Sequence, residues 1–204
     1  MNVISKLNGF HKADDAVQKR TFALDLPTSH SYHSGYQFLL GWTFRAADSS
    51  VIYGTQAFGG KSTEGAGKRL LRFRYWLEDM CAEVGPDAIF FKETPWFPVF
   101  HSFAATLTAF CEEHKIPYRG VSPGAVKRLI AGDSHANKLA VFKAVTDLGY
   151  KPEDDNQAGA LAILLFAESL AEARSQTWGF IATGAKDAPN NNRYEFGMSL
   201  GLMV

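Results

Sequence analysis

Four acidic residues stand where a carboxylate is costly unless it has a partner. Asp25 interrupts the apolar run 21–26, Glu93 comes near the end of the apolar run 87–94, and Asp154 and Asp155 precede a long apolar stretch. A buried carboxylate needs a counter-charge or a bound cation. Converging carboxylates bind hard divalent cations, and two such cations about 4 Å apart can support cleavage of a phosphodiester bond. Asp25, Glu93 and Asp155 are therefore candidate catalytic and metal-ligating residues, with Asp154 as the second choice at the last position.

Each acid taken singly is more commonly a helix cap or a salt-bridge partner, so the elements that carry the acids decide whether they meet. Short β-branched and aromatic runs predict strands, and apolar residues three and four positions apart predict helices. The predicted strands are 21–26, 38–46, 51–58, 87–94 and 116–122, and the predicted helices are 68–84, 102–114, 124–131, 135–150 and 157 to about 174. Residues 95–100 are expected to form an aromatic loop.

The order of these elements predicts the fold class. Three consecutive strands, followed by strands that alternate with helices, favour an α/β fold with one mixed sheet. We expect five strands, the first three in an antiparallel meander that carries Asp25, and helices on both faces. Asp25, Glu93 and the start of the last helix can then converge.

Length and composition limit the possible domain organisation and location of the protein. The chain has 204 residues and 46% hydrophobic residues, which predicts one domain over residues 1–204, with a leader arm to about residue 20 and a tail from about residue 176. Cys81 and Cys111 stand in apolar contexts and are expected to be buried thiols. The beginning of the chain is too polar for a signal peptide, and the longest apolar run is too short to span a membrane. We expect a cytoplasmic protein without a membrane partner.

Basic residues cluster locally along the chain, although the 21 basic and 21 acidic residues give no net charge. One basic group lies in residues 61–74, including Arg69 and Arg72, and a second lies in residues 115–151, including Lys127 and Lys138. Such clustering suits a nucleic-acid groove, although about half of these residues are expected to be ordinary solvated helix-face residues. The aromatic residues of segment 95–100 could stack on unpaired bases or pack in the core.

Two other motifs lead to weaker interpretations. The loop 54–62 ends in Gly-Lys-Ser, but Thr55 stands where a phosphate-binding loop needs its first glycine. A sugar-kinase or actin-like function is disfavoured because phosphate-binding glycines do not follow Asp25. His30 and His33 could contact a metal or a phosphate, although solvated loop histidines are the simpler interpretation.

The ordered set of segments resembles a known family. The segments are ALDL, LLGWTF, GTQAFGG, RLLRFRYWLEDM, PDAIFFKETP, IPYRGVSPGAVKRLIAGDSHANKLAVFKAV and DDNQAGALAILL. Together they are similar to the RuvC-type Holliday junction resolvases of the ribonuclease H-like superfamily, above all to the phage and prophage branch. The resemblance runs from about Thr21 to Ala167.

The resemblance implies a function and a site. It implies a Mg²⁺- or Mn²⁺-dependent endonuclease that acts as a homodimer on branched or junction DNA. It places the first-strand ligand on Asp25 and the strand-end ligand on Glu93, and it makes Lys127 and Lys138 the best DNA-facing candidates, with Arg69 and Arg72 as further ones.

The last motif departs from the family pattern. Gly159 stands where the family has a metal-binding aspartate, and Gln157 stands where its phage members have a glutamate. We expect Gly159 to leave a gap filled by water, so that metal binds weakly and Gly159→Asp restores it. Asp155 or Asp154 could complete the site instead. Three functions stay open: an active endonuclease, a degenerate resolvase-like protein that binds structured DNA without cutting it, and a structural or regulatory subunit of a larger complex.

Overall fold

The computed structural model describes residues 20–28, 37–59, 65–94 and 96–183, without the side chains of 173–183. Two compact units divide the chain, residues 1–169 and residues 170–204. All further description concerns the first unit. The predicted leader arm up to residue 19, His30 and His33, and the tail beyond residue 183 lie outside the described residues.

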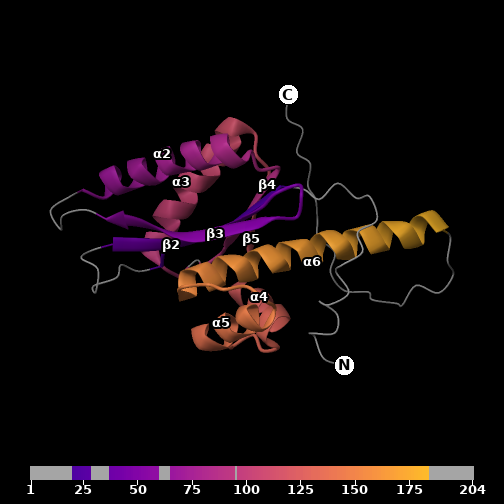
Figure 1. The fold of residues 1–204 in the computed structure, drawn as a ribbon. Helices are drawn as coiled ribbons and strands as arrows, with labels where there is room; N and C mark the ends of the chain where they lie inside the picture. The colour runs from indigo at the N-terminus through magenta and orange to yellow at the C-terminus, as the bar shows by residue number, and fades with distance from the viewer. Residues whose placement is uncertain (1–19, 29–36, 60–64, 95, 184–204) are drawn as a thin grey trace. The chain divides into compact units, whose positions relative to one another are not determined.

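Five strands form one mixed sheet (Figure 1). Strands β1 (Thr21–Asp25), β2 (Gln37–Arg45) and β3 (Val51–Gly59) pair antiparallel, whereas β4 (Ala88–Lys92) and β5 (Tyr118–Val121) pair parallel to β1 and to β4 respectively. The strand order is β3-β2-β1-β4-β5. The predicted five-stranded sheet, the meander and the position of Asp25 on the first strand are therefore confirmed.

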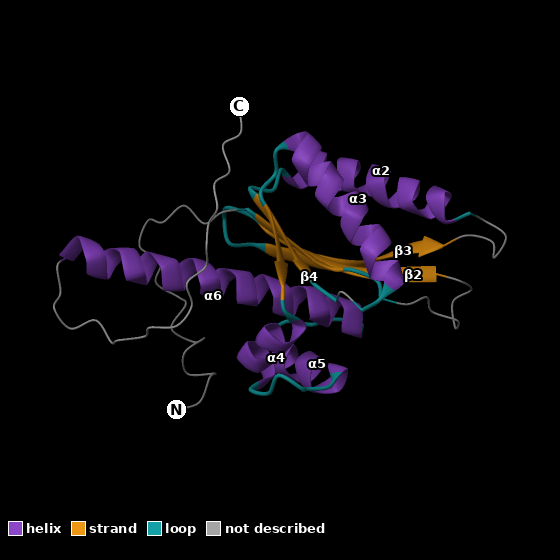
Figure 2. Ribbon diagram, turned by 180° about the vertical axis from the view of Figure 1, so that it is seen from behind, coloured by secondary structure: helices purple, strands orange, loops and turns teal. Residues whose placement is uncertain are grey.

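Helices cover both faces of this sheet (Figure 2). Helices α2 (Ala66–Val84) and α3 (Pro98–His114) lie on one face, and α4 (Pro123–Ala131), α5 (Lys138–Asp147) and the beginning of α6 (Asp155–Thr183) lie on the other. Several predicted helix boundaries were wrong, including both ends of the helix predicted at 135–150, which spans Lys138–Asp147. Helix α3 begins inside the expected aromatic loop because Pro98 is favourable in a first turn, and α6 runs past residue 174.

The pleat of β1 divides its side chains between two apolar cores. Phe22 and Leu24 are fully buried against α2 and α3, whereas Ala23 is buried in the second core with residues of α4, α5 and α6. Because successive side chains of a strand point to opposite faces, Asp25 lies on the same face as Ala23. The single acid of this strand therefore faces α6.

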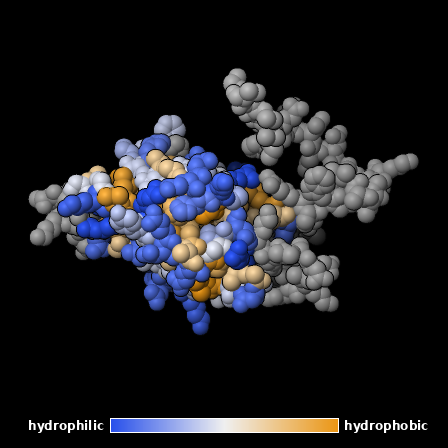
Figure 3. Space-filling model, turned by 90° about the horizontal axis from the view of Figure 1, so that it is seen from above, coloured by the Kyte–Doolittle hydropathy of each residue, from blue (hydrophilic) through white to orange (hydrophobic). Residues whose placement is uncertain are grey.

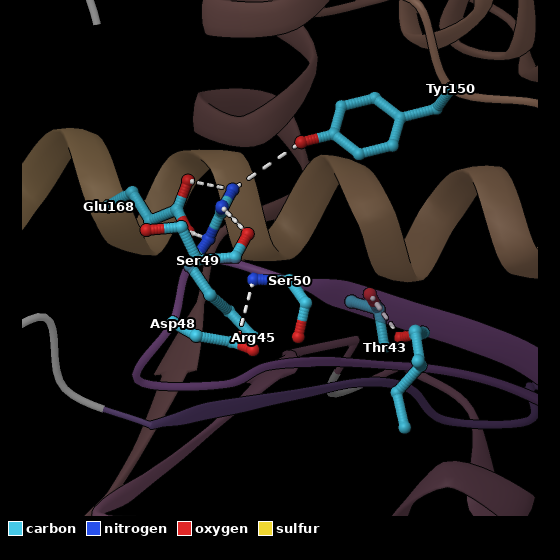
Figure 4. A network of polar contacts seen from close by, with 8 residues as sticks. Thr43, Arg45, Asp48, Ser49, Ser50, Tyr150 and Glu168 are labelled. Atoms are coloured by element: carbon cyan, nitrogen blue, oxygen red, sulfur yellow. Dashed lines mark hydrogen bonds and ion pairs between the residues drawn. The ribbon is translucent and has the colours of Figure 1, made fainter. Parts of the chain in front are cut away.

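A polar network ties α6 to the end of β2 (Figure 4). Arg45 at the end of β2 donates hydrogen bonds to both carboxylate oxygens of Glu168, with its Nε and with its Nη2, and the Tyr150 hydroxyl lies 3.4 Å from the same Nη2. The two charged side chains are only 16% and 23% exposed. Burial by itself lowers the pKa of Arg45, but Glu168 and Tyr150 outweigh it and the pKa is raised.

The remaining surface and the thiols add little chemistry. Both cysteines are free. Cys111 is buried as expected, whereas Cys81 is only partly buried. Burial raises the pKa of Cys81 to about 11 and that of Cys111 to about 12, so neither is a reactive thiolate. Seen from the side of α2, the described surface is mostly hydrophilic with scattered apolar residues (Figure 3). Within the described ranges, none of the helices combines the length and the apolar character needed to cross a membrane.

The Arg45–Glu168 pair gives a stability prediction. Glu168→Gln leaves a largely buried guanidinium without its counter-charge, so the free energy of unfolding should fall by about 2 to 3 kcal/mol in denaturant titration. Asp147→Asn is the matched control, because its exposed pair with Lys143 on α5 should contribute less than about 1 kcal/mol. Equal losses in the two variants would contradict this assignment.

Candidate functional site

A small cleft opens where β1 and β4 end beside the first turns of α4, α5 and α6. Its polar lining is Asp25, Lys92, Lys127, Lys138 and Asp155, and its floor includes Gly159. These six residues define the cleft from here on. Its volume of about 70 Å³ accommodates an ion or a few waters, and is too small for an organic ligand.

Strand register places Lys92 beside Asp25. Leu24 of β1 is in register with Phe91 of β4, so the next pair along the two parallel strands is Asp25 and Lys92, on the face that α6 covers. The Lys92 ammonium forms an ion pair with the Asp25 carboxylate. The side chains are 26% and 12% exposed, so this pair is partly removed from solvent.

Glu93 points away from the cleft. It follows Lys92, so the pleat turns its side chain toward the opposite face. A Cβ built on Gly120 would lie 3.1 Å from the Glu93 carboxylate, and Gly120 is in register with Phe91, which is buried against α2 and α3. Glu93 itself is exposed. The structure thus does not bring the Asp25 and Glu93 carboxylates together, contrary to the expectation that they share one cation.

Asp154 and Gln157 hold the beginning of α6. One Asp154 carboxylate oxygen accepts hydrogen bonds from the backbone N–H groups of Asn156 (2.9 Å) and Gln157 (2.8 Å), and the other accepts one from the Thr55 hydroxyl (2.6 Å). The buried Gln157 side chain accepts a hydrogen bond from the Glu153 N–H at 3.0 Å. This arrangement is close to a capping box. Asp154 therefore acts as the helix cap and fastens α6 to β3.

Asp155, the first residue of α6, is the second carboxylate of the cleft. Its side chain is 40% exposed and forms an ion pair with Lys138, the first residue of α5. The Asn137 side chain caps α5 by accepting the Ala140 N–H at 2.8 Å, which places Lys138 at the mouth of the cleft. Asp25 and Asp155 are thus both in the cleft, and each has a lysine as its partner.

Glycines allow α6 to lie directly on the sheet. A Cβ built on Gly159 would come well under 3.0 Å from the Asp25 carboxylate, and one built on Gly41 of β2 would come equally close to the backbone carbonyl of Asn156. The expected water-filled gap at Gly159 is wrong, because the Asp25 side chain itself occupies that space. Gly159 is thus a close-packing residue in this chain.

The cleft does not fit a divalent cation. Within the described ranges, no group of three or more His, Cys, Asp or Glu side chains is placed to hold a metal ion. The cleft holds two carboxylates and three ammonium groups. Pro123, Lys138 and Asp155 are the first residues of three helices, whose amino ends carry partial positive charge. The electrostatics of the cleft therefore favour an anion.

Sequence reasoning missed Lys92, although a signal for it was present. A lysine inside the predicted strand 87–94 is as unusual as the aspartate in strand 21–26, and opposite charges on two strands can pair once the strands are neighbours in register. Selecting the acids alone drew attention to Glu93, one residue further on.

The predicted DNA-contacting residues separate into two groups. Lys127 on α4 and Lys138 on α5 line the cleft. Arg69 and Arg72 lie on α2, which covers the other face of the sheet. Arg72 donates a hydrogen bond of 2.6 Å to the Gly59 carbonyl, and the Arg69 guanidinium stands 5.1 Å from the ring centre of Phe38. Their role in DNA binding stays a prediction.

Comparison with solved structures gives the fold family. The RuvC structure of Thermus thermophilus in complex with a Holliday junction substrate matches with a TM-score of 0.56 and 19% identity, over 72% of this chain and 90% of that one. Another Thermus thermophilus RuvC structure matches with a TM-score of 0.54 and 20% identity, over 71% and 90%. The sequence matches no family model and no curated protein. At this level of identity the similarity establishes a RuvC-type, ribonuclease H-like fold, and the phage branch stays a prediction.

Glycine packing gives a second prediction. Gly41→Ala should lower the free energy of unfolding by more than about 2 kcal/mol, because its new methyl group meets a backbone carbonyl that cannot move alone. Gly159→Ala should destabilise less, since it meets the end of the Asp25 side chain. The control Gly67→Ala on α2 has open space and should stabilise by up to about 1 kcal/mol. Thermal or denaturant unfolding measures all three, and a stabilised Gly159→Ala would contradict the close contact.

Proposed function

We propose that this chain binds branched DNA, with the four-way junction as the preferred class, and that it does so without metal-dependent cleavage. The observation that carries the proposal is the charge of the cleft within a RuvC-type fold. Three lysines and the amino ends of three helices surround two aspartates that are already paired. A phosphate backbone is the ligand that suits this charge.

Lys127 and Lys138 are the residues best placed to meet DNA. Lys138 is 81% exposed at the first turn of α5, and Lys127 lies one helix away on the same cleft. A lysine ammonium has three donors, so Lys138 can contact a phosphate while it keeps Asp155 as a partner. Phosphate contacts of this kind contribute affinity and position the protein, and they do not read sequence.

An aromatic segment next to β4 supports a preference for distorted DNA. Trp96 is 88% exposed and Phe97 is 45% exposed, three and four residues after Glu93. Exposed aromatic rings stack on unpaired bases, which branch points provide and continuous duplexes do not. The homodimer that the family resemblance implies belongs to this proposal as well, because two copies could engage two arms of one junction.

An active endonuclease remains the second candidate, because Asp25 and Asp155 are retained in the cleft. A cation would have to displace Lys92 from the first carboxylate and Lys138 from the second. Glu93 faces away and Gly159 supplies no side chain, so two carboxylates at most would be available. Mg²⁺ binds through oxygen ligands, and the three lysines oppose its charge. This argument favours binding without cutting.

Removal of positive charge at the cleft tests the binding surface. Lys127→Ala and Lys138→Ala should each weaken binding to a labelled four-way junction by about 1 kcal/mol per lost phosphate contact, and should make the salt dependence less steep. Lys143→Ala, an exposed lysine of α5 that is paired with Asp147, is the control and should leave affinity unchanged. Binding that ignores both salt and the two cleft lysines would indicate a protein partner instead.

Metal chelation separates the two candidate functions. The unaltered protein should bind the labelled junction in EDTA, without a requirement for Mg²⁺ or Mn²⁺, and should leave the DNA strands intact on a denaturing gel when either metal is present. Nicking that requires the metal and disappears in Asp155→Ala would establish the endonuclease and overturn the proposal of binding alone.

A further inference from the structure

We propose that Lys92 is a built-in substitute for a divalent cation, so that the Asp25 end of the cleft is complete without metal. This inference concerns the charge balance of the folded protein and does not depend on DNA binding. It starts from the ion pair between Lys92 and Asp25. Neither strand on its own requires this pair.

The first step is that Asp25 needs a positive partner. Its side chain is 12% exposed, at the end of the central strand and under the first turns of α6. A carboxylate in such a position is strongly disfavoured unless a charge or several donors compensate it. Lys92 provides that charge from the neighbouring strand, at the register position where side chains are nearest.

The second step is that Lys92 excludes a metal from the same place. An ammonium group only donates hydrogen bonds, so it cannot serve as a metal ligand while it is charged. It also places a positive charge directly on the carboxylate that a cation would need. Because Lys92 is covalently attached to β4, any cation must compete with an ammonium group that already pairs with Asp25.

The third step is the matching absence of a side chain at residue 159. The Asp25 carboxylate lies against the Gly159 backbone, in the space that a larger side chain would require. Residues 92 and 159 therefore flank Asp25 from two sides, one with a positive charge and one with no side chain. Carboxylates at both positions would put three acids around one point, which is the composition that hard cations bind.

This arrangement predicts how metal binding can be created. Lys92→Glu combined with Gly159→Asp should yield a Mn²⁺ site with affinity at least about tenfold higher than that of the unaltered protein, and added Mn²⁺ should raise the unfolding temperature of the double variant. Binding is measured by calorimetry and by the electron paramagnetic resonance of free Mn²⁺, without DNA. Gly159→Asp alone should gain no such site, because Lys92 remains as the counter-charge.

Two controls make the experiment specific. Lys143→Glu makes the same charge change on an exposed surface and should not create a Mn²⁺ site. Lys92→Met removes the ammonium without adding a ligand, so it should lower the unfolding temperature, and Mn²⁺ should not restore it. The unaltered protein is the reference sample and should leave Mn²⁺ free in solution.

Three results would overturn the proposal. Tight Mn²⁺ binding by the unaltered protein that is lost in Asp25→Asn would show that the cation displaces Lys92. A folded double variant without gain in Mn²⁺ affinity would show that residues 92 and 159 do not surround a common point. Unchanged stability in Lys92→Met would show that the ion pair does not compensate Asp25. None of these outcomes depends on whether the protein binds junction DNA.

Discussion

The ion pair between Asp25 and Lys92 is the interaction on which the cleft depends. The central strand carries one carboxylate toward α6, and that carboxylate needs a partner before the helix can cover it. The parallel neighbour β4 supplies the ammonium, and Gly159 supplies the space. The approach of α6 also depends on Gly41, where any side chain would meet the Asn156 carbonyl. Charge compensation and the absence of side chains thus act together to bring helix and sheet into contact.

Anchors at several points keep α6 in this position. Asp154 caps its first turn and accepts the Thr55 hydroxyl, so the beginning of the helix is fixed to β3. Further along, Glu168 pairs with Arg45 at the end of β2. These contacts reach strands β3 and β2 of the meander. The two apolar cores add the hydrophobic contribution to stability, which is non-directional. The beginning of α6, which lines the cleft, is therefore fixed to the sheet, while Lys138 at the mouth of the cleft is exposed.

A shared fold does not by itself carry shared chemistry. The similarity to RuvC structures concerns the path of the backbone. Function depends on which side chains the backbone brings together. In this cleft, Asp25 pairs with Lys92 and Asp155 pairs with Lys138, and these pairs are the basis of the proposed preference for phosphate over a divalent cation. Positions 92 on β4 and 159 on α6 are the ones that set the charge around Asp25.

The sequence by itself determined the sheet, because hydrophobic periodicity and element order are local properties. Strands and helices were predicted nearly in place, with Asp25 on the first strand. It could not determine which side chain meets Asp25, because that depends on strand register. A shift of one residue exchanges Lys92 for Glu93, and the pleat sends these two side chains to opposite faces. The tertiary structure alone decided that Asp154 accepts the Thr55 hydroxyl of β3 and that Gly159 is in contact with a carboxylate, since both follow from how closely α6 approaches the sheet.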